Sequence, residues 1–173
     1  MNKILSVLVR NHAGVLSHVA GLFTRRGYNI ESLVAGVTAD PEISRLTIAI
    51  AGDEAVVDQV IKQINKLIDV ISVEELTYED SITRELLLMT LFVSPDKRHE
   101  VITLTNILGA TVADISETTM TVEFTGNSLK INNIIKSLDA YEIKELARTG
   151  LLALPLESNL DKKLPAIGSQ PSS

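Results

Sequence analysis

Apolar residues change their spacing repeatedly along the first 78 residues, between the period of a strand and the period of a helix. Runs of alternating apolar and polar residues flank two longer stripes, in which apolar residues recur every three or four positions. This pattern predicts the order strand, helix, strand, strand, helix, strand. The predicted bounds are 3–9, 13–26, 30–38 and 44–51, then a helix capped by Asp53, and finally 70–78.

The first predicted helix carries signals at both ends. Gly27 follows its last turn, where a left-handed C-cap is common, and Arg25 and Arg26 place positive charge beside the last carbonyls. Asn11 is the expected N-cap, and Gly14 leaves the N–H groups of the first turn open to an anion. An alternative without a ligand is equally open: Asn11 caps the helix, Gly14 allows a tight turn, and neither binds an anion. The apolar face that we expect in the core comprises Val15, Leu16, Val19, Leu22 and Phe23.

The same order of elements repeats after a polar stretch at residues 79–83. We therefore predict an α+β protein of two tandem ferredoxin-like βαββαβ modules, each with two helices on one face of an antiparallel sheet. The elements of the repeat are strand 84–94, helix 97–108, strands 111–116 and 120–125, a helix capped by Asn127 or Ser128, and strand 142–148. The expected domains are a first module at 1–78, a linker at 79–83, a second module at 84–156 and a mobile tail at 157–173.

Composition narrows the class of protein. In 173 residues, 45% are hydrophobic, which is enough for a core. The formal net charge of -6 argues against nucleic acid or an anionic membrane as a partner. The chain has no cysteine, so it has no disulfide or thiolate metal site, and the cytoplasm is the expected location. Residues 1–10 are too short and too polar for a signal peptide, and no other stretch is expected to span a bilayer.

Residues that could perform catalysis are few. The three histidines, His12, His18 and His99, have no metal-ligand spacing, and no serine lies in a nucleophile motif. We interpret His12 and His18 as solvated surface residues, although His12 could touch a ligand at the turn. Carboxylates are scattered over turns and exposed faces, so no metal site is expected. Gly14 and Gly21 do not form a dinucleotide fingerprint.

Since these residues favour neither catalysis nor metal binding, the feature that could bind a ligand is the turn before the first helix, beside the predicted edge strand 30–38. In the usual sheet order of this topology strand 30–38 lies at an edge, and it carries little charge that would prevent pairing, which predicts a homodimer joined there. Asn11 and Asn29 offer amides that can contact an ammonium or a carboxylate group. Gly36 either leaves room for an aliphatic side chain or marks a β-bulge.

Several ordered strings in residues 1–154 are more specific than this topology. They are GVL at 14–16, VAGLF at 19–23, RGYNIESL at 26–33, SRLT at 44–47 and IKELARTG at 143–150. With these strings the chain closely resembles the regulatory (small) subunit of acetohydroxyacid synthase, also called acetolactate synthase, and its N-terminal half resembles an ACT domain.

The resemblance implies a non-catalytic subunit that activates a separate, thiamine-diphosphate-dependent catalytic subunit and confers feedback inhibition by valine or another branched-chain amino acid. The cofactors would belong to the catalytic subunit, and this chain would need none. In the family the effector lies between two ACT domains. Matching positions imply an effector site formed by Asn11, Ala13, Gly14, Val15, Leu16, Asn29, Ile30 and Gly36.

This chain departs from the family pattern at two places. Ala13 stands where relatives often have proline, which loosens the turn before Gly14. Segments 108–111 and 155–156 lack basic residues that relatives often carry. Two alternatives stay open at the level of sequence: a stand-alone amino-acid-sensing ACT protein that regulates another enzyme, and a small enzyme on the same scaffold.

Overall fold

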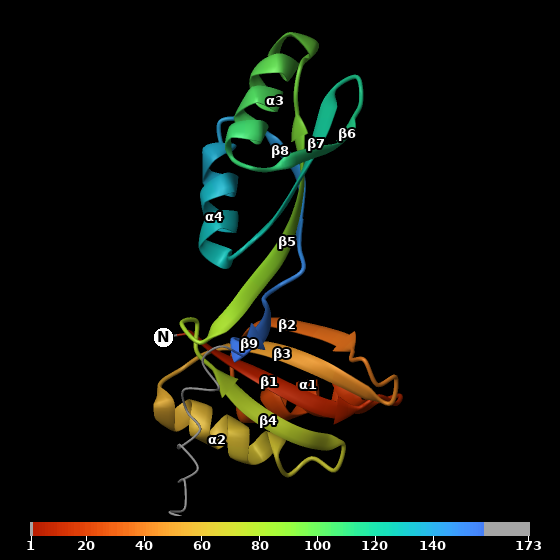
Figure 1. Ribbon diagram of the computed structural model, residues 1–173, viewed down its shortest axis with the longest axis vertical. Helices are drawn as coiled ribbons and strands as arrows, with labels where there is room; N and C mark the ends of the chain where they lie inside the picture. Colours follow the sequence, from red (N-terminus) through yellow and green to blue (C-terminus); the bar gives the residue numbers. More distant parts are fainter. Residues whose placement is uncertain (1, 158–173) are drawn as a thin grey trace, which may run out of the picture.

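The structure is a computed structural model that describes residues 2–157 of the chain. Two modules follow one another along the long axis of the molecule, each with two α-helices on one face of a sheet (Figure 1). The predicted α+β class and the two ferredoxin-like modules are therefore confirmed. The predicted mobile tail at 157–173 lies outside the described residues except for its first residue.

The first module contains a four-stranded antiparallel sheet with the order β2-β3-β1-β4. Strand β2 therefore lies at an edge, as predicted. Alternate strand residues such as Leu5 and Val7 form the core with the apolar faces of the two helices. The elements are β1 Asn2–Arg10, α1 Val15–Arg26, β2 Ile30–Val37, β3 Ile43–Ala51, α2 Glu54–Ile64 and β4 Val70–Leu76.

Helix α1 matches its prediction better at its end than at its start. Gly27 has a φ of 69° and closes the last turn as the expected left-handed cap. The helix begins at Val15, however, two residues later than predicted. Leu16 is 44% exposed, so its place in the predicted core face is wrong. Adjacent helical residues point about 100° apart, and here Val15 takes the inward direction.

The second module has the sheet order β6-β7-β5-β8, and β9 pairs with β5 outside this path. Leu87, Met89 and Leu91 of β5 form its core with apolar residues of both helices. Asn127 is the N-cap of the last helix and accepts a hydrogen bond of 2.9 Å from Lys130 N. The elements are β5 Ser81–Phe92, η1 Pro95–Lys97, α3 Arg98–Ile107, β6 Thr111–Ile115, β7 Thr119–Gly126, α4 Ser128–Ser137, β8 Ile143–Arg148 and β9 Leu152–Pro155.

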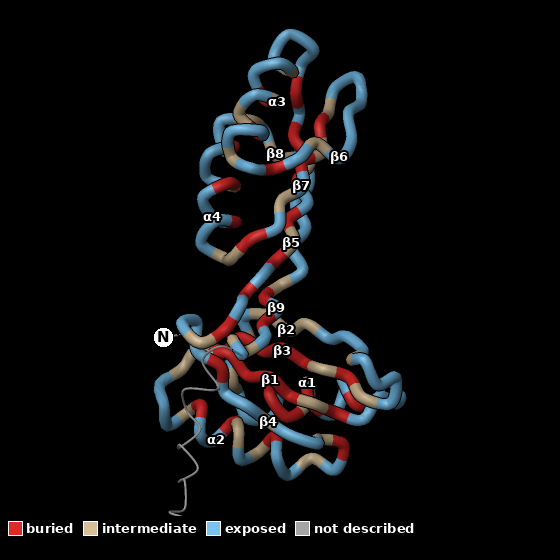
Figure 2. The backbone as a smooth tube through the Cα atoms, in the orientation of Figure 1, coloured by how far each residue is buried: buried red, intermediate tan, exposed pale blue. Residues whose placement is uncertain are grey.

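A ribbon of β5 and β9 joins the two modules. Strand β5 begins at Ser81, so residues 81–83 are a strand and not part of a linker at 79–83 as predicted. Its first four residues pair with β9, and its remainder pairs with β7 and β8. Figure 2 shows buried positions in both modules and along β5 between them. The sequence pattern missed β9 because four residues that end in proline carry little periodicity.

The short ribbon strand also packs on the first module. Leu151 and Ala153 form a small buried cluster with Ile4 and Leu76, which lie on the sheet face opposite the helices. All four residues are at most 5% exposed. The segment around Leu151 and Ala153 therefore covers part of a sheet face of the first module that would otherwise expose apolar side chains.

Candidate functional site

The turn between β1 and α1 is shaped by Gly14. Its φ is 89°, a left-handed conformation that glycine adopts without strain, and α1 starts at the next residue. The predicted N-cap role of Asn11 is wrong. The Asn11 side chain donates a 2.9 Å hydrogen bond to Pro41 O, and its backbone N–H donates to Glu42 O at 2.8 Å. Asn11 therefore ties this turn to the β2–β3 turn.

A carboxylate contacts both histidines of this region, which are exposed surface residues as predicted. His12 Nε2 lies 2.5 Å from one oxygen of Asp69, and His18 Nδ1 lies 3.1 Å from the other. The Asp69 side chain is 9% exposed, although the histidine side chains are 48% and 60% exposed. The sequence gives no signal of this cluster, because Asp69 lies more than fifty positions further along the chain.

Hydrogen bonding shifts the charge states within this cluster. The Ala13 carbonyl, followed by Asp69, raises the pKa of His12, and the two histidines lower the pKa of Asp69. His12 Nδ1 lies 2.9 Å from Ala13 O, so both ring nitrogens of His12 face acceptors. Only the protonated imidazolium can donate to both. The protonated form of His12 is therefore the one that can hold the peptide before Gly14 through both nitrogens.

The eight predicted effector-binding residues form two groups at opposite ends of the first sheet. Ile30 pairs with Ile50 at one end, whereas Gly36 pairs with Arg45 close to the turn. Gly36 lies six positions beyond Ile30 along the strand, a distance of about 20 Å. The members of the group at the turn are Asn11, Ala13, Gly14, Val15, Leu16 and Gly36, and those at the far end are Asn29 and Ile30. One copy of the chain does not bring both groups together.

The outer edge of β2 is open. Within the described residues β2 pairs only with β3, and its one charged side chain is Glu31. The ladder is irregular between Ile30 and Ser32, not at Gly36, so the bulge that Gly36 could have marked lies elsewhere. A Cβ atom at Gly36 would meet no atom within 4 Å. Gly36 therefore leaves open space beside the strand end nearest the turn.

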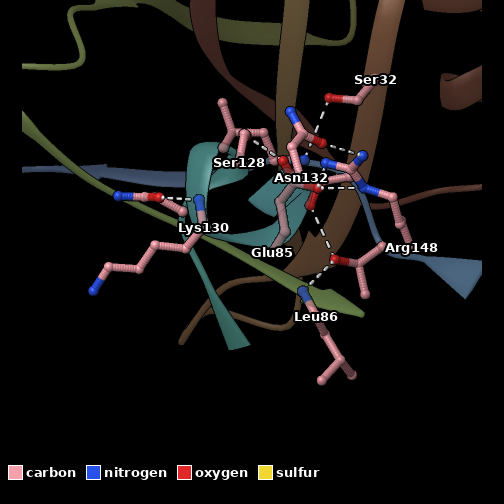
Figure 3. A network of polar contacts seen from close by, with 11 residues as sticks. Ser32, Glu85, Leu86, Ser128, Lys130, Asn132 and Arg148 are labelled. Atoms are coloured by element: carbon pink, nitrogen blue, oxygen red, sulfur yellow. Dashed lines mark hydrogen bonds and ion pairs between the residues drawn. The ribbon is translucent and has the colours of Figure 1, made fainter. Parts of the chain in front are cut away.

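A second polar region lies where the modules meet (Figure 3). Glu85 is 6% exposed, and its Oε2 accepts from Arg148 Nε at 3.0 Å and from Arg148 Nη2 at 2.8 Å. Its Oε1 accepts a hydrogen bond from the Ser128 hydroxyl. Arg148 Nη1 donates to Asn132 Oδ1 at 2.9 Å. The sequence did not indicate this network, since its members lie on three separate elements.

Neither a metal centre nor a membrane span is found in residues 2–157. No group of three or more His, Asp or Glu side chains among them is arranged to hold a metal ion. None of the helices in this part of the chain has the length and apolar character needed to cross a membrane.

Family models match nearly all of the described chain. An ACT domain of the acetohydroxyacid synthase small-subunit type matches residues 5–72, and a model for the small subunit of acetolactate synthase matches residues 84–157. The chain belongs to the acetolactate synthase small-subunit family. The resemblance noted in the sequence is thereby confirmed.

Two curated members of the family and one solved structure align along almost their full length. A probable acetolactate synthase small subunit of Archaeoglobus fulgidus is 49% identical over 154 residues, which are 89% of this chain and 96% of that protein. The isozyme 3 small subunit of Salmonella typhimurium is 44% identical, over 89% of this chain and 95% of that protein. The crystal structure of an acetolactate synthase small subunit from Thermotoga maritima has 34% identity and a TM-score of 0.83, over 90% of this chain and 97% of that chain.

Proposed function

We propose that this chain binds a separate acetolactate synthase catalytic subunit, activates it and makes it sensitive to valine or another branched-chain amino acid. The observation that carries the proposal is the pair of family matches, one in each module. The catalytic site and its cofactors then belong to the partner subunit, and the complex works in the cytoplasm. The domain division that fits this role is an ACT domain at 1–78 and a C-terminal ferredoxin-like domain at 84–156.

The effector carboxylate binds at the start of α1. The first N–H groups of a helix have no carbonyl partner within the helix, and they carry partial positive charge. Gly14 has no side chain, and a Cβ atom built on it would meet no atom within 4 Å, so this end of the helix is accessible. His12, when protonated, adds positive potential beside it, and its raised pKa favours that form. An anionic group of small size fits these properties.

A second copy of the chain completes the effector site. Two β2 strands that pair antiparallel about a two-fold axis near Leu33 place Ile30 of one copy opposite Gly36 of the other. Asn29 and Ile30 of the second copy then lie beside the turn of the first. The open edge of β2 supports this pairing. The asparagine amides hold the ammonium group, and the branched side chain lies against the neighbouring strand.

The test is to mix the purified chain with its catalytic subunit. Acetolactate formation should rise on mixing, and valine should then inhibit it. If neither property changes, the regulatory role is wrong. Selective binding of an amino acid without any effect on the synthase would instead favour a stand-alone sensor.

Substitution of Gly14 tests the effector site within this complex. Gly14→Asp should abolish valine inhibition and preserve activation, because its carboxylate would occupy the anion position. Gly14→Asn is the matched control, since it has nearly the same size, tolerates a positive φ and has no charge. The control should remain at least partly sensitive to valine. Normal valine inhibition of the complex with Gly14→Asp would show that the turn does not bind the effector.

A further inference from the structure

Two strings that carry the family resemblance, 26–33 and 143–150, meet where the modules join. Ser32 Oγ accepts a 3.3 Å hydrogen bond from Leu151 N. Gly150 has a φ of 87°, and a Cβ atom there would lie 3.0 Å from Ser32 Cβ and 3.3 Å from Val34 Cγ2. Glycine therefore permits the close approach of β2 to the chain that leaves β8. Neither the activation nor the effector site explains this contact.

A cavity of about 540 Å³ lies beside this contact, and both modules form its wall. This volume is within the range of small-molecule sites in proteins. The first module contributes residues that include Glu31, Ser32 and Tyr78, and the second contributes residues that include Ser128 and Arg148. Hydroxyl and charged groups predominate over aliphatic ones. The cavity thus favours a polar ligand.

Arg148 presents hydrogen-bond donors on the wall of the second module. Its guanidinium is held on one side by Glu85 and through Nη1 by Asn132 (Figure 3). Three of its five N–H groups are used in these bonds within the described residues, which leaves two. The side chain is 32% exposed. A fixed, partly accessible guanidinium of this kind is suited to a carboxylate.

The wall of the first module offers acceptors. The Glu31 carboxylate and the Tyr78 phenol both line the cavity. Burial, followed by the charges of Glu31 and Glu85, raises the pKa of Tyr78, so this phenol stays neutral at physiological pH. A carboxylate beside a neutral hydroxyl can hold an ammonium group. The two modules therefore contribute different groups to the cavity: the first contributes Glu31 and Tyr78, and the second contributes Arg148 together with its partner Glu85.

We propose that this cavity binds a small zwitterion, an α-amino acid with a polar side chain, with its carboxylate on Arg148 and its ammonium group at Glu31 and Tyr78. The hydroxyls of Ser32 and Ser128 face the remaining polar part of the ligand. Such a ligand contacts both modules and fixes their relative position. The site is separate from the turn at Gly14 and does not depend on the proposed function.

Calorimetry on the isolated chain tests the proposal with L-serine and L-glutamine as probes. Both polar probes are also used as amides that lack the carboxylate. The chain contains three tyrosines and no tryptophan, so tyrosine fluorescence reports on Tyr78, and Tyr78→Phe identifies its contribution. At least one polar probe should bind, change the Tyr78 signal and lose about tenfold or more in affinity as its amide.

Variants assign the binding to the cavity. Glu31→Gln and Arg148→Lys should each weaken binding by about fivefold or more, whereas Glu117→Gln, in the distant β6–β7 turn, should leave it unchanged. Gly14→Asp should also bind the probe normally, which separates this site from the effector turn. If Arg148→Lys does not fold, Glu31→Gln alone decides. The proposal is overturned if neither polar probe binds the unchanged chain. It is also overturned if Glu31→Gln binds the probe as tightly as the unchanged chain does and the unchanged chain binds the amide as tightly as the amino acid.

Discussion

Replacement of Arg148 by methionine should destabilise the second module by leaving a buried carboxylate without its counter-ion. Glu85 is only 6% exposed, and Arg148 provides two of the three hydrogen bonds that its side chain accepts. Methionine keeps an apolar stem of similar length, so the change removes mainly the guanidinium.

The expected cost follows from the burial of the two partners. Removal of one member of a fully buried ion pair costs about 3–5 kcal/mol. Here Arg148 is 32% exposed, and Ser128 still donates to Glu85, so about 2–4 kcal/mol is expected. This is a large part of the stability of an ordinary domain, which is about 5–15 kcal/mol. Urea unfolding followed by circular dichroism measures the difference.

A double variant tests the physical reason for this loss. Glu85→Gln removes the charge that Arg148→Met leaves unpaired, so the double variant should be more stable than Arg148→Met alone by about 1–2 kcal/mol. Asn132→Ala is the control for the remaining Arg148 contact and should cost less than about 1 kcal/mol. A double variant as unstable as Arg148→Met, or less stable, would refute the role assigned to the buried charge.

Two further predictions concern the first module and the junction. The raised pKa of His12 adds stability that is complete below 6.5, the ordinary pKa of histidine, and that disappears as pH rises through the folded-state pKa. The lowered pKa of Asp69 adds stability that is present above 3.8, the ordinary pKa of aspartate, and that is lost as pH falls through the folded-state pKa. Asp69→Asn should therefore flatten the pH dependence of thermal unfolding at both ends, and an unchanged profile would contradict the cluster. Gly150→Ala should cost about 1–3 kcal/mol in urea unfolding because of its positive φ and its approach to Ser32, whereas Gly36→Ala, in open space, should stay within about 0.5 kcal/mol; equal costs would argue against the close contact.

Local signals predicted most of the fold. Apolar periodicity located the four α-helices and eight of the nine strands in residues 2–157, because each has one buried face. Asp53 accepts from Val56 N at 2.9 Å, and Gly27 is left-handed, since each of these caps acts within a few residues of the chain. The edge position of β2 followed from the usual sheet order of the topology that these elements define.

Contacts between distant residues were not predictable in this way. Asn11 has the residue type of an N-cap, but the β2–β3 turn competes for its side chain and Gly14 takes the position before the helix. Asp69, in the loop before β4, contacts both His12 and His18, which lie far from it in sequence. Glu85 contacts Arg148 because β5 pairs with β8. In each case the sequence shows the residue type and the fold selects its partner.

Strand β2 connects the two regions that carry proposals. Its outer edge would pair with a second copy at the effector site, while Ser32 contacts Leu151 and Glu31 lines the junction cavity. A strand that is hydrogen-bonded along its length to β3 moves largely as a unit, because a shift of register at one end disrupts the ladder at the other. Pairing at the edge and occupation of the cavity therefore constrain the same strand. A ligand that holds Glu31 in place would favour the β2 geometry that the dimer needs, and by linkage the dimer would favour that ligand.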